Sequence, residues 1–231
     1  MAAWDEDMKL LLTSAGVKNA SIHAALIDLL GKSTADCNAL CIPTALYGHP
    51  QGTAVGAWRF VSGQGSKCPM VELGWKSIGL LELTALPHIG RERWIQWVSA
   101  ADILLVEGGD AVFLAHWMRQ SGLAAMLPSL PDKVWMGLSA GSMVMAPRVG
   151  EAFVEMKPPI TGDDRGLGLV GFSIFPHLDY PEFPENSMAH AQRWAAGLEN
   201  PSYAIDDQSA IQVVGGTVKV ISEGKWRYFG R

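Results

Sequence analysis

Cysteine is scarce in this 231-residue chain, and its three thiols, Cys37, Cys41 and Cys68, form no recognisable metal or disulfide pattern. Their number is odd, and none stands at a metal-ligand spacing from a histidine. The histidines are scattered and include no His-Glu-x-x-His motif. We therefore expect free structural thiols in a cytoplasmic protein, with neither a metal site nor another cofactor.

Basic charge and long apolar runs are lacking as well. Lys and Arg total 18 against 23 Asp and Glu, so the net charge is -5, and the absence of a basic stripe argues against a nucleic-acid partner. No apolar run reaches the roughly 18–20 residues that a membrane-spanning helix needs. The acidic start of the chain, residues 1–7, is unlike a signal peptide. The length suits a single α/β domain over residues 1–231 with a sizeable core.

Short apolar runs alternate with segments of helical periodicity along the chain. The runs predict strands at 8–13, 38–42, 70–73, 78–83, 101–106, 134–138 and 169–175, and the periodicity predicts helices at 19–30, 91–100, 111–121 and 184–197. Residues 44–65 are rich in glycine and polar residues and predict a loop with a short helix. Runs at 210–214 and 217–221 flank Gly215-Gly216 and predict a β-hairpin. This order predicts a mostly parallel sheet with helices on both faces and a C-terminal β-hairpin.

The most informative stretch is Gly137-Leu-Ser139-Ala140-Gly141, which fits the Gly-x-Ser-x-Gly pattern directly after an apolar run. A nucleophile elbow has this form, because a sharp turn between a strand and a helix exposes the serine hydroxyl. Glycines on both sides let strand and helix approach closely. The N–H of Ala140 would then be placed to hold an oxyanion. Ser139 is therefore the candidate nucleophile.

A serine nucleophile needs a base and an acid that orients the base. His177 leaves the apolar run 169–175, and Asp207 follows further along, so the candidates in chain order are Ser139, His177 and Asp207. Asp206 is the alternative acid, and only one of two neighbours on a strand should face the site. An α/β-hydrolase order could instead be built from Ser139, His190 and either Asp164 or Asp179. Upstream, Gly108-Gly109 follows the run 101–106, and such a turn can supply the second oxyanion N–H.

Together these motifs resemble peptidase E, the aspartyl dipeptidase family of serine peptidases, whose fold is similar to that of class I glutamine amidotransferases. The resemblance spans nearly the whole chain and rests on segments 9–14, 42–45, 106–110, 137–141, 176–177 and 205–211. It implies that Ser139 is the nucleophile, His177 the general base and Asp207 the third member, where the family carries Glu. It also implies that Gly109 and Ala140 donate to the oxyanion.

Departures from the family bear on the substrate. Asp110 stands where the family has Asn, Glu107 where it has Gly, and His190 where it has an Arg, so that only Arg193 remains of two arginines. We expect Asp110, His190 and Arg193 to contact the substrate, and we expect weakened selectivity for an acidic N-terminal residue.

The expected activity is hydrolysis of dipeptides or short peptides from the N-terminal side, by a monomer or homodimer. Two alternatives are a cyanophycinase-like exopeptidase or amidohydrolase, which acidic residues near the site would suit, and a non-catalytic binding member of the fold, which the shorter acid would suit.

Overall fold

A seven-stranded sheet with the order β3-β2-β4-β5-β1-β8-β9 forms the main layer of the computed structural model, which describes residues 9–64, 69–154 and 163–230. The first five strands in this order, β3, β2, β4, β5 and β1, are parallel to one another. Strand β8 is antiparallel to β1 and forms an antiparallel hairpin with β9. The strands are β1 Lys9–Thr13, β2 Asn38–Ile42, β3 Ser77–Leu80, β4 Ile103–Val106, β5 Val134–Leu138, β8 Ser209–Val214 and β9 Thr217–Ser222.

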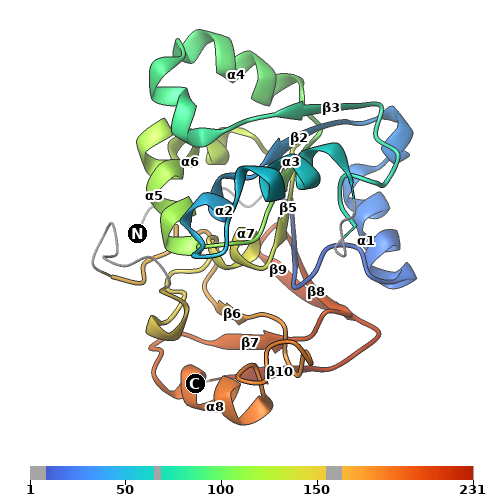
Figure 1. Cartoon of the computed structure of the whole chain (residues 1–231). Helices are drawn as coiled ribbons and strands as arrows, with labels where there is room; N and C mark the ends of the chain where they lie inside the picture. The colour runs from blue at the N-terminus through green and yellow to red at the C-terminus, as the bar shows by residue number, and fades with distance from the viewer. Residues whose placement is uncertain (1–8, 65–68, 155–162, 231) are drawn as a thin grey trace.

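Helices cover both faces of this sheet (Figure 1). Apolar side chains of α1 and α3 pack in one core cluster with alternate residues of β1, β2 and β4. Apolar side chains of α4 and α5 pack in a second cluster with the remaining residues of the same strands. Period-two alternation thus sends neighbouring strand residues into two cores. The helices are α1 Ala20–Leu30, α2 Thr44–Gly48, α3 Ala54–Ser62, α4 Arg91–Ala100, α5 Ala111–Ser121, α6 Leu123–Met126, α7 Ala140–Met143 and α8 Met188–Ala196, with 3-10 turns at Thr34–Asp36, Leu83–His88, Leu127–Ser129 and Glu151–Phe153. The predicted α/β class with a mostly parallel sheet is confirmed.

Helix α1 shows why the local predictions succeed. The Asn19 side chain accepts the N–H of Ile22 at 2.9 Å, which caps the first turn. The buried residues Ile22, Leu26 and Leu29 recur at helical spacing, and each such side chain contributes about 1.5–3 kcal/mol when buried. Gly31 ends the helix with φ 67°, a conformation that glycine adopts without a steric penalty.

Five local predictions were wrong in part. Residues 44–62 hold two helices, because Thr53 caps α3 and Phe60 anchors it in the core. Residues 70–73 form a turn that fills the core, with the Met70 carbonyl accepting the Trp75 indole N–H at 2.8 Å. The run 78–83 pairs only as far as Leu80 and then turns into a 3-10 segment. The run 169–175 is a strand only from residue 173, and the helix predicted at 184–197 begins at Met188 because Ser187 caps it.

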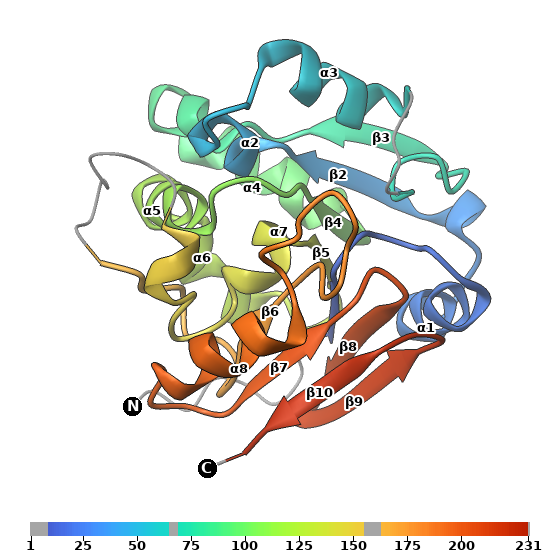
Figure 2. The same ribbon diagram turned by 60° about the horizontal axis from the view of Figure 1, so that its bottom comes forward.

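A second sheet, β10-β7-β6, was not predicted. It comprises β6 Ser173–Phe175, β7 Ser202–Ile205 and β10 Trp226–Phe229; β6 and β7 are parallel, and β10 is antiparallel to β7. Helix α8 covers it, with Trp194 packed among Phe175 and Ala204. Figures 1 and 2 show this small sheet and α8 beside the β8–β9 hairpin. Among the described residues, no helix has the length and apolar character that crossing a membrane requires.

Candidate active site

The sharp turn between β5 and α7 carries Ser139. Its backbone has φ 48° and ψ −110°, a conformation that non-glycine residues rarely adopt. The Ser139 N–H donates to the Thr13 carbonyl at 3.0 Å, which ties the turn to the end of β1. A Cβ on Gly137 would overlap the carbonyl of Gly141, and a Cβ on Gly141 would overlap that of Val106. The glycines therefore permit the close approach that the pattern predicts, and the strained serine is held from several sides.

The end of β1 supplies two residues that sequence reasoning did not assign to the site. The Thr13 hydroxyl donates to the Gly137 carbonyl at 2.7 Å, and the Thr13 carbonyl accepts the Ser142 hydroxyl at 2.8 Å. Ser14, fully buried, accepts the backbone N–H of His177 at 2.7 Å and donates to Asp207 Oδ1 at 3.0 Å. Two hydroxyl residues at the end of an otherwise apolar strand were the signal that could have revealed them.

His177 and Asp207 lie together although 30 residues separate them. Each lies two residues beyond the end of a strand of the second sheet, and because β6 and β7 are parallel neighbours their carboxyl ends meet. His177 Nδ1 lies 2.7 Å from Asp207 Oδ1, so the shorter Asp side chain spans the distance. His177 has φ 54°, and of the described non-glycine residues only Ser139, His177 and Asp179 have positive φ. Unusual backbone conformations thus coincide with two of the three candidate residues.

Two opposing effects act on the Asp207 carboxyl. Burial raises its pKa, but the hydrogen bonds from His177 and Ser14 and the nearby charges of His177 and Lys18 outweigh burial, and the pKa is lowered below its ordinary value. The carboxylate is therefore ionised at neutral pH and accepts a hydrogen bond from the N–H at Nδ1 of His177. That hydrogen bond leaves Nε2 as the free ring nitrogen.

Asp206, the alternative acid, is engaged elsewhere. Its Oδ1 accepts the N–H of Gln208 at 3.0 Å and the hydroxyl of Ser209 at 2.6 Å, and its Oδ2 accepts the N–H of Lys225. These contacts hold the turn between β7 and β8 and the start of β10. The two neighbouring acids thus face opposite ways: Asp207 toward His177, and Asp206 into the turn.

The turn after β4 approaches Ser139 from the neighbouring strand. A Cβ on Gly108 would lie 3.4 Å from Cβ of Ser139. Gly109 has φ 134°, and a Cβ on it would overlap the carbonyl of Ala45. Ala140 follows Ser139 as the first residue of α7. Within the described ranges, no hydrogen-bond acceptor engages the N–H of Gly109 or of Ala140. Both groups could therefore donate to a negatively charged oxygen.

A cavity of about 540 Å³ contains these groups. Ser139, His177, Asp207, Gly108 and Gly109 all line it. It lies where the carboxyl ends of β4 and β5 in the main sheet meet those of β6 and β7 in the second sheet. Its volume falls in the roughly 300–1,000 Å³ range of small-molecule sites. The arrangement can place a carbonyl substrate between a nucleophile, a base and two backbone donors.

The family model described as peptidase family S51 matches residues 10–221. The chain belongs to peptidase family S51. As a member of this family it is a serine-type peptidase. A search of curated proteins finds no match.

Two solved structures have the fold of this S51 peptidase. A protein from Listeria monocytogenes EGD-e, described as a candidate peptidase E, is 19% identical with a TM-score of 0.70, and the match covers 94% of this chain and 99% of that one. A peptidase from an acI-B1 Actinobacterium is 17% identical with a TM-score of 0.65, with 96% and 94% covered. At these identities the likeness concerns the fold alone.

Other predicted site residues of the S51 peptidase lie outside the cavity lining. Asp110 is fully buried and its Oδ1 caps α5 by accepting the Phe113 N–H at 2.8 Å. His190 and Arg193 lie on α8 with exposed side chains, and His190 Nδ1 is 3.1 Å from the Ser187 hydroxyl. The structure does not bring these three residues together with Ser139.

The acids of the alternative catalytic order are also paired elsewhere. Asp164 forms an ion pair with Arg148, and Asp179 one with Lys225 at 3.2 Å. Across the described residues, no group of three or more His, Cys, Asp or Glu side chains has an arrangement that could hold a metal ion.

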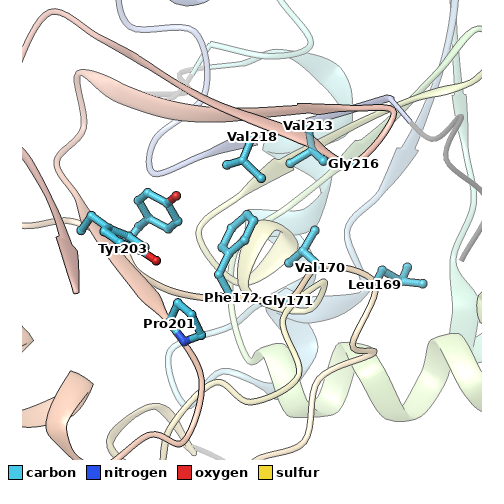
Figure 3. A pocket seen from close by; sticks show the side chains of 10 residues that line it. Leu169, Val170, Gly171, Phe172, Pro201, Tyr203, Val213, Gly216 and Val218 are labelled. Carbon is cyan, nitrogen blue, oxygen red and sulfur yellow. The ribbon is translucent and has the colours of Figure 1, made fainter. Parts of the chain in front are cut away.

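A second cavity, of about 340 Å³, lies between the hairpin and the second sheet. Figure 3 shows Phe172, Tyr203, Val213 and Val218 around it. The described residues that line it are apolar apart from their backbone groups and the tyrosine hydroxyls, and they include no serine, cysteine, histidine or carboxylate. The cavity at Ser139 is therefore the better candidate for catalysis.

Proposed function

We propose that this S51 peptidase hydrolyses dipeptides or short peptides from the N-terminal side, with Ser139, His177 and Asp207 as its catalytic triad. The 2.7 Å contact between His177 and Asp207, in the same cavity as the strained Ser139, carries the proposal. The partner is a small peptide. The compartment that we propose is the reducing cytoplasm, in keeping with the buried free thiols of Cys37 and Cys41.

The proposed reaction is acyl transfer. Nε2 of His177 removes the proton of the Ser139 hydroxyl as its oxygen attacks the scissile carbonyl carbon. The N–H groups of Gly109 and Ala140 stabilise the oxyanion, and Asp207 stabilises the imidazolium. The imidazolium then protonates the leaving amine, so the C–N bond breaks and an acyl-Ser139 ester remains. Water, activated by the same histidine, hydrolyses that ester and regenerates the hydroxyl.

Covalent labelling with a fluorophosphonate, followed by peptide mapping, tests the assignment. The reagent reacts with a serine only when a base activates the hydroxyl. We expect Ser139 to be labelled in the wild type and in His190→Ala, and labelling to be lost in His177→Ala. His190→Ala is the matched control, because it removes the histidine of the alternative catalytic order. Labelling that survives in His177→Ala but not in His190→Ala would exchange their roles, and no labelling of the wild type would contradict the proposal.

A further inference from the structure

The cavity around Ser139 has an aromatic and aliphatic wall. Tyr180 and Phe183 line it together, Phe153 and Met143 contribute from other segments, and Leu46 contributes from α2. The rings of Tyr180 and Phe183 also contact the imidazole of His177, with centroids 6.1 and 5.6 Å away. A substrate carbonyl at Ser139 would therefore have apolar side chains close to the atoms flanking it.

This wall is fixed to the catalytic histidine by short-range hydrogen bonds. The N–H of Tyr180 donates to the His177 carbonyl at 3.1 Å, and the N–H of Phe183 donates to the Tyr180 carbonyl at 3.0 Å. Asn186 closes the loop, because its carbonyl accepts the Asp179 N–H at 2.8 Å. Phe183 nevertheless leaves 40% of its surface exposed, so much of its ring is available for contact.

The charges around the cavity disfavour an acidic substrate side chain. The described residues that line the cavity include no Lys or Arg, but they include the two carboxylates of Glu182 and Glu185. Asp207 adds a third carboxylate, which accepts a hydrogen bond from His177. A substrate carboxylate here would lose its hydration without gaining a Lys or Arg partner from the described lining, and it would face like charges. An apolar side chain meets neither cost and gains contact with the aromatic wall.

We propose that the substrate residue supplying the scissile carbonyl carries an aromatic or large aliphatic side chain, and that Phe183 is a specificity-determining residue for it. The proposal rests on the hydrolase function above, because it assumes that Ser139 attacks that carbonyl. The residue that supplies the carbonyl lies nearest the nucleophile, so its side chain is the one that meets the wall formed by Tyr180 and Phe183.

Hydrolysis of matched dipeptides Phe-Leu, Leu-Leu, Asp-Leu and Arg-Leu tests the proposal, with fluorophosphonate labelling of Ser139 measured on the same protein. We expect kcat/KM for Phe-Leu and Leu-Leu to exceed that for Asp-Leu by about tenfold or more, given the value of one buried apolar side chain. Preference for Asp-Leu or Arg-Leu would overturn the proposal. Labelling without hydrolysis of any of the four would also overturn it and leave the nucleophile assignment standing, whereas no labelling would remove the proposed function itself.

Two variants separate specificity from general damage. Phe183→Ala should lower kcat/KM for Phe-Leu by about tenfold, lower that for Asp-Leu much less, and leave the rate of Ser139 labelling nearly unchanged. Trp226→Ala is the control, because Trp226 is 45% exposed on β10 and is not among the described residues that line the cavity. This change should leave kcat/KM for Phe-Leu and for Asp-Leu unchanged. Equal losses for both substrates in Phe183→Ala would contradict the assigned role.

Discussion

Replacing Asp207 with asparagine isolates the role of one negative charge. Asparagine preserves the shape of the side chain but cannot carry the carboxylate that lies 2.7 Å from His177 Nδ1. The side chains of His177 and Asp207 are 16% and 19% exposed, so solvent screens the pair only in part. In the proposed reaction the carboxylate matters most when His177 becomes an imidazolium during attack, because that is when the positive charge forms.

The expected loss follows from this geometry. Two unit charges about 4 Å apart at an effective dielectric constant of about 20 interact by roughly 4 kcal/mol. Losing that stabilisation in the transition state lowers the rate by about 1,000-fold. We therefore expect Asp207→Asn to lower kcat by about three orders of magnitude while the protein stays folded.

Asp206→Asn is the matched control, because it makes the same chemical change one residue away. The Asp206 carboxylate accepts hydrogen bonds from the N–H groups of Gln208 and Lys225 and from the hydroxyl of Ser209, so the change weakens a turn rather than the proposed triad. We expect the free energy of unfolding to fall by about 1–3 kcal/mol and kcat of the folded protein to stay within about threefold. Peptide turnover and urea unfolding of both variants measure the two effects. Asp207→Asn activity within tenfold of the wild type, or a greater catalytic loss in Asp206→Asn, would refute the reasoning.

Three further changes test the elbow and its surroundings. Ser139→Gly should abolish turnover and raise the free energy of unfolding by about 1 kcal/mol in urea titrations, because glycine relieves the strain at φ 48°; a less stable variant would contradict a strained turn. Gly137→Ala should lower the free energy of unfolding by about 2 kcal/mol or more and abolish Ser139 labelling, because the added Cβ would overlap the Gly141 carbonyl. Gly171→Ala is its control: the space around the added Cβ is open, so both stability and labelling should be nearly unchanged. Burial and the charge of Glu72 raise the pKa of Glu107 from 4.5 to about 7, although the hydrogen bond from Gly108 lowers it. Between these two pH values the folded protein therefore holds a proton that the unfolded chain releases. Stability should therefore fall as pH rises from about 4.5 to about 7, by on the order of 2 kcal/mol, and Glu107→Gln should flatten this profile in unfolding experiments at several pH values.

Local chemistry explains which elements could be predicted. The cap Asn19, the apolar spacing after it and Gly31 specify α1 within a dozen residues, and Asp110 and Gly122 bound α5 in the same way. The second sheet gave no comparable signal, because β6 and β7 are short and their pairing joins segments separated by a helix. Residues 44–65 were predicted as a loop with a short helix, whereas they hold α2 as well as α3; the cap Thr53 and the buried Phe60 mark α3.

The sequence by itself determined the elbow. Gly137, Ser139 and Gly141 are defined by spacing, and the steric reason for both glycines operates within five residues and the adjoining strand. The same level of reasoning predicted His177 and Asp207 as candidates, in the order Ser, His and acid.

Only the tertiary structure decided which candidates meet. Ser14 contacts Asp207 across 193 residues of sequence, and His177 across 163, so no local pattern records either contact. The direction in which Asp206 and Asp207 face is set by the turn to β8 and the start of β10, which hold Asp206 away from the site. The tertiary structure likewise placed Asp110, His190 and Arg193 outside the cavity lining and lined it with Tyr180 and Phe183. The physical reason is common to all of these: a site assembled at the carboxyl ends of strands from two sheets depends on how the strands are ordered in space, which spacing along the chain does not encode.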